Sequence, residues 1–123
     1  MPMPQDSTVY DPMYADCPSR QVLDLIADKW TVLVVSAISH GHHRNGELLR
    51  RVGGISQKAL TRTLRQLEHD GLITRHDRGE LPRHVEYHLT ETGSSLQPLL
   101  AALCEWSVDH MTEVTTARSH SPR

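Results

Sequence analysis

The stretch that decides the fold is SQKALTRTLRQLEHDG, residues 56–71, near the middle of the 123-residue chain. Ser56 is a favourable helix N-cap, and Gly71 is suited to end the helix. Leu60, Leu64 and Leu67 recur at spacings of four and three, which places them on one face and predicts a buried stripe. The opposite side carries hydrogen-bond donors, namely Gln57, Lys58, Thr61, Arg62 and Arg65. We therefore predict a helix that packs on a core along one side and presents polar and cationic groups on the other.

The periodicity changes from helical to alternating directly after this helix. Residues alternate in character over 73–77 and again over 85–89, which is the pattern of two β-strands. Gly79 and Pro82 favour a turn between them, and Arg78 and Arg83 lie beside that turn. This segment predicts a two-stranded hairpin with a basic tip.

The segments before residue 56 predict helices, with one ambiguity. Pro18 opens a short periodic apolar segment, and residues 47–52 predict one or two helical turns. The run over residues 30–38 is nearly continuous in apolar residues and rich in β-branched ones. Periodicity leaves strand and helix open for this run, and propensity alone favours a strand.

The last predicted helix, over residues 91–112, is apolar on more than one face. One small domain covers only a single apolar stripe of such a helix. We therefore expect the remaining apolar surface of the helix to pack against a second subunit. The expected dimer contacts are Leu96, Leu99, Leu103 and Trp106. We expect a flexible arm over residues 1–16, one folded domain over 17–112 and a frayed tail over 113–123.

Length and composition place further bounds on the protein. A chain of this length is sufficient for one domain with a modest core. No apolar run approaches the roughly 18 residues that a membrane span requires, and the first residues lack the features of a secretory signal. Two cysteines are too few for a disulfide scaffold. We therefore expect a cytoplasmic protein without membrane contact.

Charge is unevenly distributed along the chain. The formal net charge of −2 argues at first against a polyanionic partner. However, residues 44–83 hold nine of the thirteen basic residues and five of the fifteen acidic ones, so this third carries +4 and the rest carries −6. A basic centre flanked by acidic segments indicates a local anionic partner.

The predicted elements follow one another as two helices, a short helix, the donor-rich helix, the hairpin and a last helix. This is the order of a winged helix-turn-helix, which is a mostly α fold with a small β-hairpin. The chain resembles the HxlR family of bacterial transcriptional regulators, a branch of the MarR-like winged-helix proteins. The resemblance runs from Cys17 to about His110. It rests on Cys17-Pro18, Asp28-Lys29-Trp30-Thr31, Arg44 with Glu47-Leu48, GISQKALT (54–61), LEHDGLI (67–73), VEYHLTETG (85–93) and Trp106.

This resemblance implies a homodimer whose first and last helices form the interface, and it implies a helix for residues 30–38. The chain departs from the family pattern at two positions. An aromatic residue usually follows the arginine at the position of Asn45, and a tyrosine often stands near the position of Gly79. Both changes fall beside expected DNA contacts.

The fold and the charge map together predict binding of double-stranded DNA. The helix over residues 56–70 fits the major groove, which is about 12 Å wide, and the hairpin follows the neighbouring backbone. The expected contacts are Arg44, Ser56, Gln57, Lys58, Thr61, Arg62, Arg65, Arg78 and Arg83. Among them Gln57, Lys58, Thr61 and Arg62 are expected at base edges, and Arg44, Arg65, Arg78 and Arg83 at phosphates. The alternative is that these are solvated surface charges.

Cys17 is the candidate sensor residue. A thiol at the start of a helix experiences the positive end of the helix dipole, which favours the reactive thiolate. The resemblance implies the same role, since family members that sense quinones, aldehydes or oxidants are thought to use a cysteine here. The alternative is a buried, inert cysteine. Cys104 is expected to be a small core or interface residue, and a disulfide between Cys17 and Cys104 of a partner subunit stays open.

His40, His42 and His43 form the one cluster that suggests a metal, although neighbouring loop histidines rarely converge on one ion, so we predict no metal site. The sequence contains no phosphate-binding loop and no recognisable catalytic set, which predicts neither an enzyme nor a cofactor.

We predict a homodimeric regulator, a repressor by family default, that binds a near-palindromic operator and responds through Cys17 to an oxidant or electrophile. One alternative is a constitutive regulator, or one responsive to a small hydrophobic ligand, in which Cys17 is structural. The other is a winged-helix module that binds protein.

Overall fold

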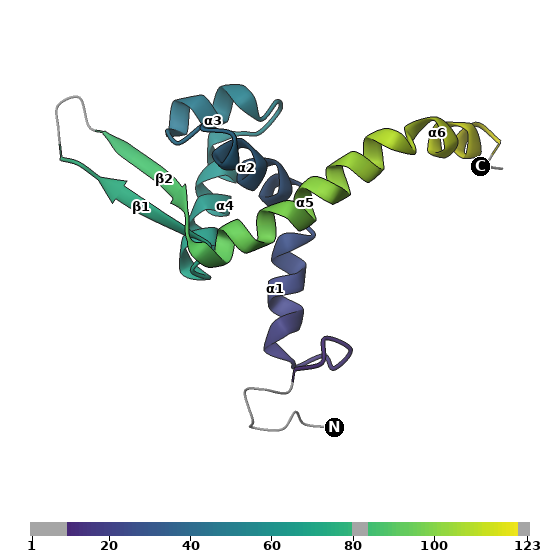
Figure 1. The fold of residues 1–123 in the computed structure, drawn as a ribbon, viewed down its shortest axis with the longest axis horizontal. Helices are drawn as coiled ribbons and strands as arrows, with labels where there is room; N and C mark the ends of the chain where they lie inside the picture. Colours follow the sequence, from purple (N-terminus) through teal and green to yellow (C-terminus); the bar gives the residue numbers. More distant parts are fainter. Residues whose placement is uncertain (1–9, 80–83, 121–123) are drawn as a thin grey trace.

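The computed structural model describes residues 10–79 and 84–120, and its elements follow the predicted order with one additional helix at the C-terminal end (Figure 1). They are α1 (Pro18–Ile26), α2 (Lys29–Ser39), α3 (Asn45–Arg51), α4 (Gln57–His69), β1 (Ile73–Asp77), β2 (Val85–Leu89), α5 (Glu91–Asp109) and α6 (Met111–Ser119). The two strands form one antiparallel hairpin. The predicted fold class, mostly α with a small β-hairpin in a winged helix-turn-helix, is confirmed.

Helix α2 resolves the ambiguous apolar run in favour of a helix. The Asp28 carboxylate caps it by accepting hydrogen bonds from the backbone N–H groups of Trp30, at 2.9 Å, and Thr31, at 3.4 Å. Val34, Val35 and Ile38 are fully or almost fully buried. Burial of these side chains at the centre of the domain outweighs the β propensity of the run.

Helix α4 forms as its sequence predicts. The Ser56 hydroxyl accepts a hydrogen bond from the Ala59 N–H at 3.0 Å, and Leu60, Leu64 and Leu67 are buried. The chain then turns at Gly71, whose φ of +75° strongly favours glycine. The core lies between α2, α4 and α5, with α3 and the base of the hairpin packed against it.

Gly93 allows the first turn of α5 to pack directly against the chain that follows α4. A Cβ atom at this position would lie 2.0 Å from the backbone oxygen of Leu72. Thr90 completes the junction, because its hydroxyl donates to the Gly71 carbonyl at 2.6 Å and accepts from the Gly93 N–H at 3.0 Å. This junction fixes the direction in which α5 leaves the hairpin.

The two ends of the described chain project from the domain. In Figure 1, α1 extends away from the core on one side, and α5 runs outward past α2 to α6. The frayed tail predicted over residues 113–123 is corrected in part, because residues 113–119 belong to α6. Glu113 near its start and Arg118 near its end complement the helix dipole, a signal that the composition of the tail concealed. No helix among the described residues is long and apolar enough to cross a membrane.

Candidate nucleic-acid interface

The exposed side of α4 gathers the donors that its sequence predicts. The side chains of one continuous patch on this side are Lys58, Thr61, Arg62, Arg65, Gln66 and His69. Lys58, Arg62 and Arg65 are exposed, and none of them forms an ion pair within 4.0 Å among the described residues. Their charge is therefore uncompensated and available to an anion such as a phosphate.

Gln57 occupies a more constrained position than the sequence predicts. Its amide and that of Asn45 exchange two hydrogen bonds, at 2.7 and 2.9 Å, and Gln57 Nε2 also donates to Thr61 Oγ1 at 3.0 Å. Asn45, which stands where the family pattern usually has an aromatic residue, thus forms a polar bridge from α3 to α4. Sequence reasoning identified Asn45 as a departure from the pattern but did not predict this pairing.

Arg44 lies at the start of α3, where its side chain is exposed. The Glu47 carboxylate accepts hydrogen bonds from the backbone N–H groups of Arg44, at 3.2 Å, and His43, at 3.0 Å. These two hydrogen bonds lower the pKa of Glu47 below its usual range. The backbone around Arg44 is therefore held by a carboxylate that remains ionised at neutral pH.

The arginines of the hairpin differ from those of α4 because they are paired. Arg78 lies 3.9 Å from Glu86, and Arg75 lies 3.9 Å from Asp77. The predicted contact Arg83, like the predicted turn residue Pro82, lies outside the described residues.

A second cleft, of about 420 Å³, separates α4 from the hairpin and was not predicted. It is lined by Thr61, Leu64, Arg65, Glu68, Arg75 and Tyr87. Arg75 and Tyr87 face each other in the strand register. The alternation of β1 could have revealed Arg75, because it shares a strand face with the buried Ile73.

Cys17 is the N-cap of α1 and is 1% exposed. Its Sγ lies 2.9 Å from the Ser19 hydroxyl. Burial raises the pKa of this thiol, but hydrogen bonds from the side chain and backbone of Ser19, together with those involving the backbone of Asp11 and Arg20, outweigh that effect and lower the pKa below its usual value. Cys104 is half-buried on α5, and both cysteines are free thiols.

The three loop histidines do not converge. His40 Nδ1 lies 2.7 Å from the Ser36 carbonyl oxygen, whereas the His43 ring turns to the hairpin, with Nδ1 2.9 Å from the Tyr87 oxygen. Across residues 10–79 and 84–120, no group of three potential ligands is positioned to hold a metal ion.

The predicted dimer contacts divide into two kinds. Leu96 packs partly against the core, whereas Leu99, Leu103 and Trp106 are 64%, 56% and 58% exposed. Val22 and Leu23 of α1 are also exposed. Large apolar side chains on both projecting helices are therefore left uncovered within the single chain.

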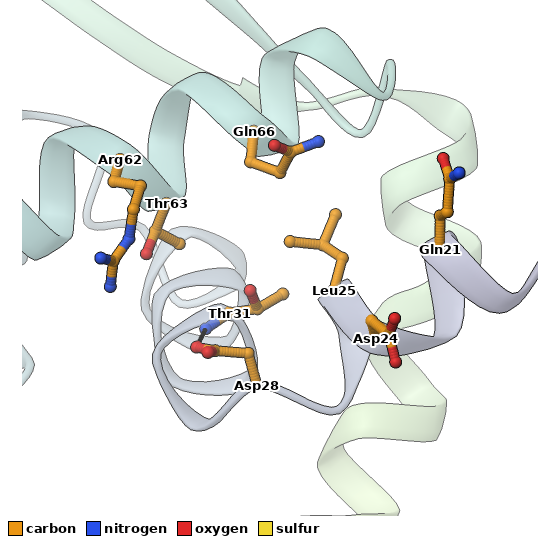
Figure 2. A pocket seen from close by; sticks show the side chains of 8 residues that line it. All are labelled: Gln21, Asp24, Leu25, Asp28, Thr31, Arg62, Thr63 and Gln66. Atoms are coloured by element: carbon orange, nitrogen blue, oxygen red, sulfur yellow. Dashed lines mark hydrogen bonds between the residues drawn. The ribbon is translucent and has the colours of Figure 1, made fainter.

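A groove of about 430 Å³ joins α1, α2 and α4 (Figure 2). Leu25 points into its centre, Thr31 and Thr63 lie beside it, and Gln21 and Gln66 are at its polar rim. Arg62 also lines the groove. A molecule bound there would contact both the projecting α1 and the donor-bearing α4.

Helices α3 and α4 form a helix-turn-helix pair that is followed by a hairpin, and α4 presents unpaired cations. This combination defines a winged-helix DNA-binding protein. The family model of the HxlR-like helix-turn-helix matches residues 25–115. The chain belongs to this family, and it is accordingly a transcriptional regulator rather than an enzyme.

Individual relatives agree with this assignment. The chain is 40% identical over 102 residues to the HTH-type transcriptional regulator YtfH of Escherichia coli K12, covering 83% of this chain and 81% of that protein. The structure of the regulator ytfH from Salmonella typhimurium superposes with a TM-score of 0.85 at 36% identity, covering 91% of this chain and 100% of that one. The redox regulator HypR in its reduced form gives a TM-score of 0.72 at 33% identity, covering 80% and 98%.

Proposed function

We propose that the protein is a homodimeric repressor that binds a near-palindromic DNA operator through α4 and the hairpin. The observation that carries this proposal is the row of exposed, unpaired cations on α4, beside the hairpin. Two copies of α4 would enter successive major grooves about one helical turn, or a multiple of it, apart.

The individual contacts are assigned from the sequence and, within residues 10–79 and 84–120, from the placement of each side chain. Lys58, Thr61 and Arg62 lie on the open side of α4 and are assigned to base edges, together with the Gln57 amide that Asn45 holds in place. Backbone phosphates are assigned to Arg44, Ser56, Arg65, Arg78 and Arg83.

The uncovered apolar face of α5 supports the dimer. Leu99, Leu103 and Trp106 are too large and too exposed for a free helix surface, and α1 adds further apolar side chains. A second copy that covers these residues, with Leu96 at the margin, would set the distance between the two α4 helices. Any change at the interface would then alter how well both helices fit one operator.

Cys17 is the proposed sensor of an oxidant or electrophile. Its lowered pKa and its position at the start of α1 favour thiolate chemistry at the N-terminal end of a helix of the proposed interface. The structural likeness to the redox regulator HypR supports this role. Cys17→Ser is expected to bind DNA as the wild type does and to remain bound in diamide or a quinone. Release of the variant by the same treatment would show that Cys17 is only structural and would favour the alternative regulators.

The proposed function is tested by selecting bound sequences from random duplex DNA and titrating the best of them. We expect the selected sequence to contain an inverted repeat and to bind far more tightly than random DNA at the same salt concentration. Equal affinity for both would overturn the proposal and favour the protein-interaction module.

A further inference from the structure

One face of the hairpin carries a connected group of imidazole side chains. In the strand register Thr74 lies opposite His88 and His76 lies opposite Glu86, so these four side chains share a face. His43, from the loop before α3, stacks on His88 with ring centroids 4.1 Å apart. We call this surface the imidazole face, and its members are His43, Thr74, His76, Arg78, His84, Glu86 and His88.

Glu86 is the centre of these contacts. Its two carboxylate oxygens accept hydrogen bonds from His88 Nε2, at 2.8 Å, and from His84 Nε2, while Arg78 lies 3.9 Å away. On the other side of His88, the His76 ring meets it edge to face at 5.4 Å, and His76 Nε2 lies 2.9 Å from the Thr74 hydroxyl. The face is thus an ordered surface rather than a set of independent side chains.

The partners of these rings define where additional protons would bind. Carboxylate and carbonyl oxygens only accept hydrogen bonds, so His84 Nε2, His88 Nε2 and His43 Nδ1 each carry a hydrogen. The second nitrogen of each ring makes no hydrogen bond among the described residues. These nitrogens can accept a proton without breaking any of the contacts above.

The imidazole face lies between two arginines that the proposed function assigns to phosphates. His43 directly precedes Arg44, and Arg78 stands at the far end of the face. Among the described residues, the other charged or titratable groups around the face are Glu47 and His42 beside Arg44. Asp77 pairs with Arg75 on the opposite face. Within residues 10–79 and 84–120, the acids around this surface are thus Glu86 and Glu47, and both remain ionised because hydrogen bonds lower their pKa values.

We propose that the imidazole face is a proton-dependent contact for the DNA backbone, in which His76, His84 and His88 bind phosphate between Arg44 and Arg78 once they are protonated. This inference rests on the proposed function. Protonation adds positive charge around a single carboxylate, so the face changes from nearly neutral to cationic. DNA binding and proton uptake are then linked.

The test measures binding of mixed-sequence duplex DNA, at constant ionic strength, between about pH 8 and about pH 6. For each proton taken up on binding, the Kd falls by about tenfold per unit of pH, and the wild type is expected to bind at least about tenfold more tightly at about pH 6 than at about pH 8. The triple variant His76→Gln, His84→Gln, His88→Gln is expected to change by less than about twofold. His120→Gln, at the far end of α6, should behave as the wild type does.

A second measurement uses the unmodified protein and so avoids any loss of folding in the variants. Calorimetric titration with the same DNA in two buffers of different ionisation enthalpy reports the protons taken up on binding. The wild type should take up on average at least about half a proton over this range, which is the uptake that a tenfold change in Kd over two pH units requires. A net uptake of zero, or a triple variant with the wild-type pH response, would overturn this inference while leaving the proposed function intact. Failure of the wild type to bind DNA at either pH would instead overturn the proposed function itself.

Discussion

The side-chain amides of Asn45 and Gln57 form a reciprocal pair of hydrogen bonds that joins α3 to α4. Both residues lie at the start of their helices, so the pair fixes the angle at which the two helices of the DNA-binding motif meet. It also fixes the rotamer of Gln57, because the same amide donates to Thr61. A polar pair therefore holds the two helices of the motif together.

The first prediction concerns this pair. Asn45→Ala should weaken DNA binding because Gln57 loses its orientation, although Asn45 itself need not touch DNA. In a double-mutant cycle with Gln57→Ala, the coupling in DNA-binding free energy should be about 0.5–1.5 kcal/mol. Strictly additive effects of the two changes would show that the pair does not position Gln57.

The second prediction concerns the junction between the hairpin and α5. Gly93→Ala places a methyl group 2.0 Å from the Leu72 oxygen and must displace the backbone. The free energy of unfolding in urea should fall by about 1–3 kcal/mol. Gly53→Ala is the matched control, since no atom lies within 4 Å of its added methyl group. Equal stability of the two variants would contradict the packing described.

The third prediction concerns assembly. Leu103→Glu introduces a charge into the apolar face of α5, where Leu103 is 56% exposed in the single chain. Sedimentation equilibrium should show a shift from dimer to monomer, because burying an unpaired carboxylate at an interface is costly. Ser39→Glu, on an exposed end of α2, should leave the dimer intact. A Leu103→Glu protein that remains dimeric would place the interface elsewhere.

The fourth prediction concerns stability at low pH. Hydrogen bonds from His88 and His84, with the charge of Arg78, lower the pKa of Glu86 to about 2 from its usual 4.5. A carboxyl whose folded-state pKa is depressed stabilises the fold above its unfolded pKa, and this contribution is lost as the pH falls from 4.5 towards 2. Glu86→Gln should therefore flatten the fall in unfolding free energy over that range. An unchanged pH profile in the variant would show that Glu86 contributes no such linkage.

Much of the fold was predictable because its signals are local. The leucine spacing and N-cap of α4 predict that helix, and alternation predicts both strands. Helix α2 was not decided by periodicity, since burial on all sides removes the polar face that distinguishes a helix from a strand. The resemblance to the family decided it instead. Helix α6 was missed because its composition suits both a solvated helix and a frayed tail.

The site was predictable to a smaller extent because its geometry depends on contacts distant in sequence. The exposed donors of α4 follow from the face opposite the leucines. The bridge from Asn45 to Gln57 spans twelve residues, and the stacking of His43 on His88 spans more than forty. Periodicity within one element carries no information on such pairs. Arg75 was overlooked for a different reason, because strand alternation was used to find the hairpin and not to sort its faces.

The most direct test of the central claim is the salt dependence of DNA binding by the wild type and by Arg62→Ala, Arg65→Ala. If these exposed, unpaired cations bind phosphates or bases, the double variant should bind DNA more weakly than the wild type does. The slope of log Kobs against log salt should also become shallower, by about one for each phosphate that the variant no longer neutralises. Arg118→Ala, on α6, removes a similar charge outside the site and should retain the wild-type slope. Identical affinity and slope in the double variant and the wild type would contradict the assignment of α4 as the DNA-binding helix.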